Sequence, residues 1–235
     1  MLATLRQDLQ AVRDRDPAAR STLEIILCYP GLHAIWGHRV SHWLWSHDFK
    51  LIGRALSALI CWLTGVDIHP GATLGPGLFI DHATGVVIGE TSSVGTNVTI
   101  YQGVTLGGTN LKRGNRHPSV GDRVTIGAGA KVLGPVTVGH DSRIGANAVV
   151  VKPVPANTVV VGVPGQVVSR SQPRTATAPP DLDVTVLPDL FGVSLRSLLA
   201  RIDDLENSLP NNTGPAPTHA QPSEAGVWPG EDFSI

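Results

Sequence analysis

Aliphatic residues return every six positions along the middle of the chain. Thirteen of them keep this spacing: Ile68, Leu74, Ile80, Ile88, Val94, Ile100, Leu106, Val120, Ile126, Val132, Val138, Ile144 and Val150. A period of six matches neither the period of an α-helix nor the alternation of an ordinary strand. It is typical of a parallel β-helix, in which three hexads form one triangular coil and the aliphatic side chains fill its interior. Glycine follows most of these aliphatics, because a corner needs a residue that is free of the steric penalty of a Cβ.

The hexad spacing is interrupted twice. Two extra residues follow Ile80, and eight extra residues follow Leu106. The second insertion is long enough to leave the coil as a protruding arm over residues 108–118. We therefore expect a β-helix domain over residues 65–168 that carries this arm.

Residues 1–64 show a helical pattern instead. An apolar stripe at helical spacing opens the chain, through Leu2, Leu5, Leu9 and Val12. Ser21 and Glu24 form the signature of a capping box before a second apolar run. The pattern predicts two further helices that are rich in tryptophan, over residues 32–47 and about 49–63. This region is expected to pack as an α-helical cap on a mainly β fold.

Residues 169–235 differ again in composition. A linker rich in Pro, Ser, Thr and Ala comes first. One short helix is then predicted by the helical spacing of Leu195, Leu198, Leu199, Ile202 and Leu205. The composition after this helix predicts a flexible C-terminal tail.

Charge and composition exclude several classes of partner. The chain has 18 basic and 19 acidic residues, a net charge of -1, so it offers no basic excess for nucleic acid. Its two cysteines fit neither a disulfide framework nor a zinc cluster. No signal peptide and no apolar run long enough to span a membrane stands out. We expect a cytoplasmic protein that binds neither membrane nor nucleic acid.

The two insertions hold the candidate chemistry. Asp81 and His82 lie in the first insertion, and the arm presents Arg116 and His117. The hexad register places Asp67 and His82 on adjacent coils, where they can meet. A carboxylate that accepts a hydrogen bond from one imidazole nitrogen leaves the other free to act as a general base. Capping of a corner is the alternative reading of these residues, since Asp suits turns.

Several strings of residues resemble the serine O-acetyltransferases, members of the hexapeptide-repeat acyltransferase superfamily. They are VDIHPGATLG, IDHATGVVIGET, YQGVTLGGT, RHP, VGDRVTIGAGAKVLGPVTVG, IGANAVVVKPVP and VVGVPG, with DLQAVRDRDPAA and GLHAIWGHRVSHWLW upstream. The resemblance implies a left-handed β-helix and an enzyme of cysteine biosynthesis. It also implies that acetyl passes from acetyl-CoA to the hydroxyl of L-serine, which gives O-acetylserine and CoA.

The resemblance also implies roles for individual residues. His82 matches the general base and Asp67 the carboxylate that orients it. Asp16 and Asp81 match carboxylates near the amino group of serine, Arg116 matches the residue that holds the substrate carboxylate, and His117 completes the pocket. Gly108, Ala128 and Ala146 match small residues along the path of CoA. No metal is implied.

Partners follow from the same resemblance. It implies active sites between the subunits of a homotrimer, and a hexamer is less expected because only about 64 residues precede the repeats. L-Cysteine is implied as a feedback inhibitor that occupies the serine pocket. Phe233, Ser234 and Ile235 resemble the terminal peptide that enters O-acetylserine sulfhydrylase.

Three other functions remain open at this point. An acetyltransferase for a sugar or a xenobiotic uses the same scaffold and a histidine base. A trimeric β-helix carbonic anhydrase needs three histidines around zinc, of which His82 and His117 could be two. A scaffold that only docks the sulfhydrylase would need no catalytic base.

Overall fold

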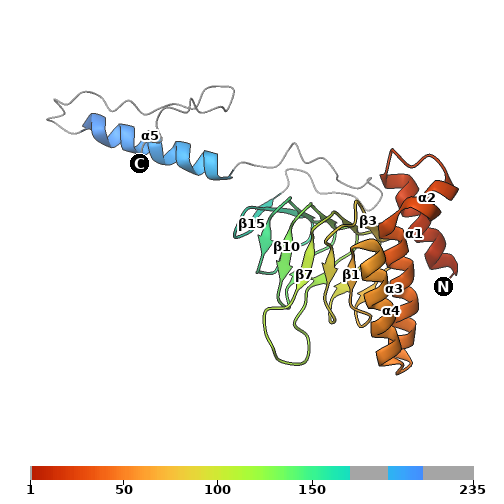
Figure 1. The fold of residues 1–235 in the computed structure, drawn as a ribbon. Coiled ribbons are helices and arrows are strands. Elements are labelled where there is room, and N and C mark those ends of the chain that lie inside the picture. The colour runs from red at the N-terminus through yellow and green to blue at the C-terminus, as the bar shows by residue number, and fades with distance from the viewer. Residues whose placement is uncertain (1, 170–189, 209–235) are drawn as a thin grey trace, which may run out of the picture. The chain divides into compact units, whose positions relative to one another are not determined.

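The computed structural model describes residues 2–169 and 190–208. The chain divides into two compact units, Met1–Pro188 and Asp189–Ile235. The first unit holds four helices and a coil of short strands, and the helices lie at one end of the coil (Figure 1). Within the described residues, no helix is both long enough and apolar enough to cross a membrane.

The four helices form where the sequence predicts them, with boundaries shifted by one or two residues. They are α1 (Leu2–Arg15), α2 (Thr22–Cys28), α3 (Pro30–Ser46) and α4 (Lys50–Thr64). The Ser21 side chain caps α2 by accepting a hydrogen bond from the Glu24 backbone N–H at 3.2 Å. Helix α3 begins two residues before the predicted start. Pro30 forms its first turn, where a missing N–H and a fixed φ suit a helix.

The coil consists of short parallel strands in three sheets. The first sheet contains β1 (Asp67–Ile68), β4 (Val87–Ile88), β7 (Thr105–Gly107), β10 (Lys131–Leu133) and β13 (Val149–Val150). The second contains β2 (Thr73–Leu74), β5 (Ser93–Val94), β8 (Ser119–Val120) and β11 (Thr137–Val138). The third contains β3 (Phe79–Ile80), β6 (Thr99–Ile100), β9 (Thr125–Ile126), β12 (Arg143–Ile144), β14 (Thr158–Val161) and β15 (Gln166–Ser169). All pairings are parallel except that of β14 with β15.

The register confirms the hexad prediction. In the first sheet Ile68 pairs with Ile88, and Ile88 pairs with Leu106. All thirteen aliphatics are at most 9% exposed, and they belong to one hydrophobic core. Both insertions are accommodated at corners, so the strands on either side stay aligned and the core continues past them.

The glycines that follow the aliphatics leave no room for a Cβ, as predicted, but the clash is with the next coil and does not come from a positive φ. Positive φ angles fall two residues later, at Gly77 (71°) and Asn97 (55°) for example. At Gly121 and Gly127, an added Cβ would lie 2.7 Å from a backbone nitrogen of the next coil. Close stacking of the coils therefore excludes a side chain there.

Buried polar contacts join the helical cap to the coil. Asp8 on α1 is fully buried and accepts two hydrogen bonds from Arg39 on α3, at 2.7 and 2.8 Å. The same carboxylate accepts the Gly77 backbone N–H at 3.0 Å. Arg15 donates to the carbonyl oxygens of Gly77 and Val98, each at 3.1 Å. These contacts determine how α1 lies against the first two coils.

The second unit contains α5 (Leu190–Ser208), in the region where the leucine spacing predicts a helix. Four of the predicted stripe residues are exposed on this helix: Leu195, Leu198, Ile202 and Leu205. The remaining one, Leu199, is half-buried.

Candidate functional site

The two-residue insertion shapes the loop that carries His82. Just after β3, His82 and Ala83 adopt φ angles of 55° and 59°, a region that non-glycine residues seldom occupy. The loop is closed by hydrogen bonds from the His82 N–H to Asp81 Oδ1 at 2.9 Å and from the Thr84 N–H to the His82 oxygen at 2.6 Å. The His82 side chain is exposed. Two successive strained residues that present an accessible imidazole point to a functional constraint.

Two carboxylates from distant parts of the sequence lie near this loop. The Tyr29 hydroxyl donates to Asp16 Oδ2 at 2.6 Å, and the Ala18 N–H donates to Asp16 Oδ1 at 2.8 Å. Burial raises the pKa of the Asp81 carboxyl, and the charge of Asp16 adds to this increase. The structure therefore places Asp16 near enough to Asp81, the neighbour of His82 in sequence, for the two carboxylates to interact electrostatically.

Asp67 lies on the coil that precedes His82. Its backbone N–H donates to the Val86 oxygen, and the Gly85 N–H donates to the Gly65 oxygen, each at 2.9 Å. These bonds stack the two segments, and both the Asp67 and the His82 side chains are exposed. Within residues 2–169, however, no hydrogen bond joins Asp67 to His82, so their pairing stays a prediction.

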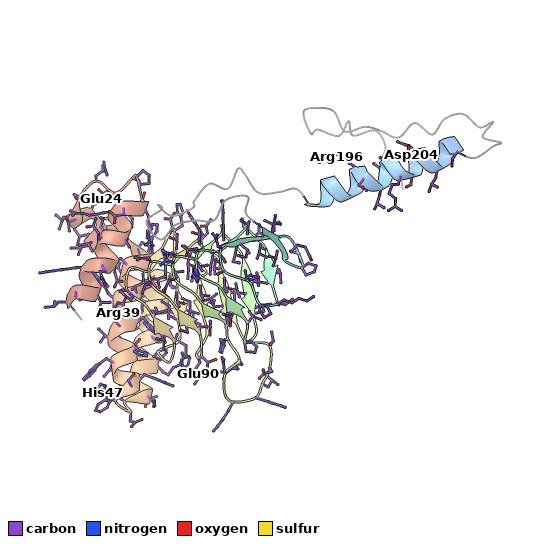
Figure 2. The ribbon with its side chains drawn as sticks, turned by 180° about the vertical axis from the view of Figure 1, so that it is seen from behind. Glu24, Arg39, His47, Glu90, Arg196 and Asp204 are labelled. Carbon is purple, nitrogen blue, oxygen red and sulfur yellow. The ribbon has the colours of Figure 1, made fainter. Side chains whose placement is uncertain are left out.

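A second group forms where the arm returns to the coil. The Arg116 guanidinium donates to Glu90 Oε2 at 2.7 Å, and Figure 2 labels Glu90 on the coil, on the side where the arm leaves it. The hydroxyl oxygen of Thr91 accepts the backbone N–H groups of Arg116 and His117 at 3.1 and 3.2 Å. Lys112 and Arg113, at the tip of the arm, are exposed.

His117 is buried as a neutral imidazole. Its Nδ1 accepts a hydrogen bond from the Thr91 backbone N–H at 3.2 Å and lies 2.8 Å from the Thr91 hydroxyl. This network assigns the ring proton to Nε2. Burial lowers the pKa of His117, and the charge of Arg116 lowers it further. His117 therefore offers one N–H donor next to the guanidinium.

The two groups occupy different corners of one chain. His82 follows a strand of the third sheet, whereas Glu90 and Thr91 follow a strand of the first. In the part of the chain that the structure describes, no hydrogen bond or ion pair joins His82 to Arg116 or to His117.

The three small residues predicted along the path of CoA also divide between these corners. Ala128 and Ala146 follow strands of the third sheet, and the Asn147 N–H donates to the Ala128 oxygen at 2.8 Å, so they stack on the corner that carries His82. Gly108 lies beside the arm, where an added Cβ would be 3.3 Å from His117 Nε2.

Gly89 provides the space for the His117 ring because it has no side chain. An added Cβ at Gly89 would overlap the ring atoms Cδ2 and Nε2. We expect Gly89→Ala to lower the free energy of unfolding by about 1–3 kcal/mol through overpacking and to release the arm. Limited trypsin digestion should then cleave faster after Lys112 and Arg113, which mass spectrometry would detect.

A double variant serves as the control for this effect. Adding His117→Ala to Gly89→Ala removes the overlap and should restore much of the lost melting temperature. An unchanged melting temperature and cleavage rate in the single variant would contradict the packing seen here.

Sequence reasoning did not single out three residues of these groups: Tyr29, Glu90 and Thr91. Glu90 and Thr91 directly follow the Ile88–Gly89 pair, so their place at a corner next to the arm was a usable signal. Nothing in the pattern around Tyr29 indicates its contact with Asp16.

Two other expectations concern the tail and metals. Phe233, Ser234 and Ile235 lie outside the described residues. Among the residues described, the structure contains no group of three or more His, Cys, Asp or Glu side chains that could hold a metal ion.

Comparisons with known proteins agree with the resemblance. Residues 117–152 match the family model described as "Bacterial transferase hexapeptide (six repeats)", and residues 1–36 match "Serine acetyltransferase, N-terminal". The chain is 60% identical over 238 residues to the serine acetyltransferase of Mycobacterium tuberculosis, and the alignment covers 100% of both chains.

Solved structures extend this similarity to the fold. The serine acetyltransferase of Neisseria gonorrhoeae in complex with serine has a TM-score of 0.69 at 44% identity, covering 72% of this chain and 69% of that chain. That of Brucella abortus with coenzyme A has a TM-score of 0.71 at 47% identity, covering 74% and 69%. A serine acetyltransferase in complex with cysteine has a TM-score of 0.72 at 45% identity, covering 76% and 68%. The chain belongs to the serine acetyltransferase family.

Proposed function

We propose that this serine acetyltransferase works in a crevice between two neighbouring subunits of a homotrimer, with the His82 loop of one subunit facing the Arg116–His117 pair of the next. One observation carries this proposal: the strained His82 loop and the arm residues lie on different corners of the same chain. A substrate that needs both groups can reach them together only where two copies meet. Closed threefold symmetry would create three such sites.

The reaction needs a base for one hydroxyl proton. His82 accepts the proton of the L-serine hydroxyl as the oxygen attacks the thioester carbonyl of acetyl-CoA. The C–S bond then breaks, and the imidazolium returns the proton to the sulfur, which gives O-acetylserine and CoA. Asp67 is assigned to orient the imidazole on assembly, because both side chains are exposed on adjacent coils of one corner.

The charges of the two groups suit the two ends of an amino acid. Asp16 and Asp81 form a negative region for the ammonium group. Arg116 keeps further guanidinium N–H donors beside its bond to Glu90, and these can hold the substrate carboxylate. The neutral His117 adds its Nε2–H to this side of the site.

The other partners are proposed on the same basis. CoA lies along the corner of Ala128 and Ala146 of one subunit and passes Gly108 of the next. The coil is proposed to be left-handed. L-Cysteine differs from L-serine in one atom and is proposed to compete for the serine pocket. Docking of the C-terminal tail on O-acetylserine sulfhydrylase and a cytoplasmic location remain expectations from sequence, as does the division at residues 64 and 168.

Mixed trimers test the shared site. His82→Asn and Arg116→Ala subunits, each inactive alone, are co-expressed with different tags and purified through both. CoA release should recover to about one third of the wild-type rate, because each mixed trimer holds one intact site among three. Mixed trimers as inactive as their parents would place both residues in one subunit's site.

Substrate choice separates the acetyltransferases. Thiol release from acetyl-CoA is measured with L-serine, homoserine, a galactoside and chloramphenicol. Release should depend on L-serine. Equal rates with the sugar or the xenobiotic would contradict the roles given to Asp16, Asp81 and Arg116.

A further inference from the structure

Among the described residues, Tyr29 is the only side chain that donates a hydrogen bond to Asp16. Asp16 lies between α1 and α2, whereas Tyr29 lies between α2 and α3. Its hydroxyl donates to Oδ2 at 2.6 Å, while the Ala18 N–H holds Oδ1 at 2.8 Å. Both oxygens of the carboxylate are therefore held, which determines its rotation. We propose that Tyr29 is a positioning residue that orients Asp16 toward the ammonium group of the amino-acid substrate. This inference rests on the proposed role of Asp16.

The backbone ties Tyr29 to the His82 loop. Tyr29 lies between α2 and α3 with φ −99° and ψ 98°, and Pro30 begins the next helix. A Cβ on Gly31 would overlap the carbonyl oxygen of Ile80, the residue that precedes Asp81. Because only glycine allows this approach, the Tyr29 junction is held against the strand that leads directly into Asp81 and His82.

The chemistry of the phenol suits a permanent donor. Burial raises the pKa of Tyr29 to about 12, and the hydrogen bond to Asp16 contributes to this increase. Tyr29 therefore stays protonated near neutral pH. It orders the carboxylate without neutralising it, so the negative charge of Asp16 remains available for a cation.

Position matters here because Asp81 is close by. Burial is the main cause of the raised pKa of the Asp81 carboxyl, and the charge of Asp16 raises this pKa further, so the two carboxylates repel each other. An unrestrained Asp16 side chain would turn away from Asp81 toward solvent. Holding it in place keeps two carboxylates on one side of the site, where an ammonium group can bridge them and relieve the repulsion.

Tyr29→Phe tests the inference. Loss of a hydrogen bond to a charged group should raise the KM for L-serine about ten-fold, while kcat and the KM for acetyl-CoA stay within about two-fold. Thr158→Val is the matched control. It removes one hydroxyl bond, to the Pro155 oxygen at 2.8 Å in the last coil, and should leave the KM for L-serine unchanged.

Two further measurements separate positioning from a general structural role. In an Asp16→Asn background, Tyr29→Phe should add less than about two-fold to the KM, because no carboxylate remains to be oriented. The inhibition constant of 3-hydroxypropanoate, which lacks the ammonium group, should not change in Tyr29→Phe. Additive losses, or equal weakening of L-serine and 3-hydroxypropanoate, would overturn the inference.

The same measurements also distinguish a failure of this inference from a failure of the proposed site. If Asp16→Asn raises the KM for L-serine and Tyr29→Phe does not, Tyr29 has no positioning role and the site stands. If Asp16→Asn leaves that KM unchanged, the role of Asp16 is wrong, and the role of Tyr29 is overturned with it.

Discussion

Replacing His82 with asparagine is expected to lower kcat for L-serine acetylation about 10²–10⁴-fold, the usual contribution of a general base. Asparagine cannot accept the hydroxyl proton near neutral pH. It does tolerate positive φ better than most residues, so it suits the angle of 55° at this position. The loss should therefore reflect chemistry and not collapse of the loop. Thiol release from acetyl-CoA at saturating L-serine measures it.

A second histidine provides the control. His47 is an exposed histidine that directly follows α3, and Figure 2 labels it at the lower end of the cap. His47→Ala should keep the wild-type rate. The His82→Asn variant should elute at the wild-type size and melt within a few degrees of it. Turnover within about three-fold of wild type would remove His82 from the mechanism.

The largest effect on stability is expected from the buried pair of Asp8 and Arg39. Asp8→Ala should lower the free energy of unfolding by about 3–5 kcal/mol, because it leaves a buried guanidinium without its carboxylate. The Arg39 side chain is 12% exposed, so water cannot replace the lost partner fully. The backbone N–H of Gly77 loses its acceptor as well. Chemical denaturation monitored by tryptophan fluorescence measures the change.

Two comparisons make this result specific to burial. Glu24→Gln breaks the surface pair with Arg20, whose side chain is 84% exposed, and should leave stability nearly unchanged. Asp8→Ala combined with Arg39→Met removes both charges and should recover most of the loss. If Asp8→Ala proves as stable as Glu24→Gln, the pair does not hold the cap on the coil.

The coil could be predicted because its interior selects one residue class at one period. Each aliphatic in the register is buried, so a polar residue at that phase would be left without a partner, and the period appears directly in the sequence. The candidate residues of the two insertions stood out because they interrupt this period. Residues added to a regular coil are not needed for its core.

The contacts between distant segments could not be predicted in this way. Asp16 and Tyr29 come from helix junctions with no fixed offset from the hexads, and their meeting depends on how α1 and α3 pack against β3 and how α2 packs against both helices. The reason for the corner glycines also lay outside the sequence, since it depends on the distance between stacked coils.

The chain by itself determined the repeat, its two interruptions and the helical pattern of the cap, because each is a periodic pattern of burial. Only the tertiary structure decided that the carboxylates gather beside His82 while Arg116 and His117 are held at another corner. The physical reason is that a corner is defined by the stacking of coils, so residues far apart in sequence become neighbours only once those coils have formed.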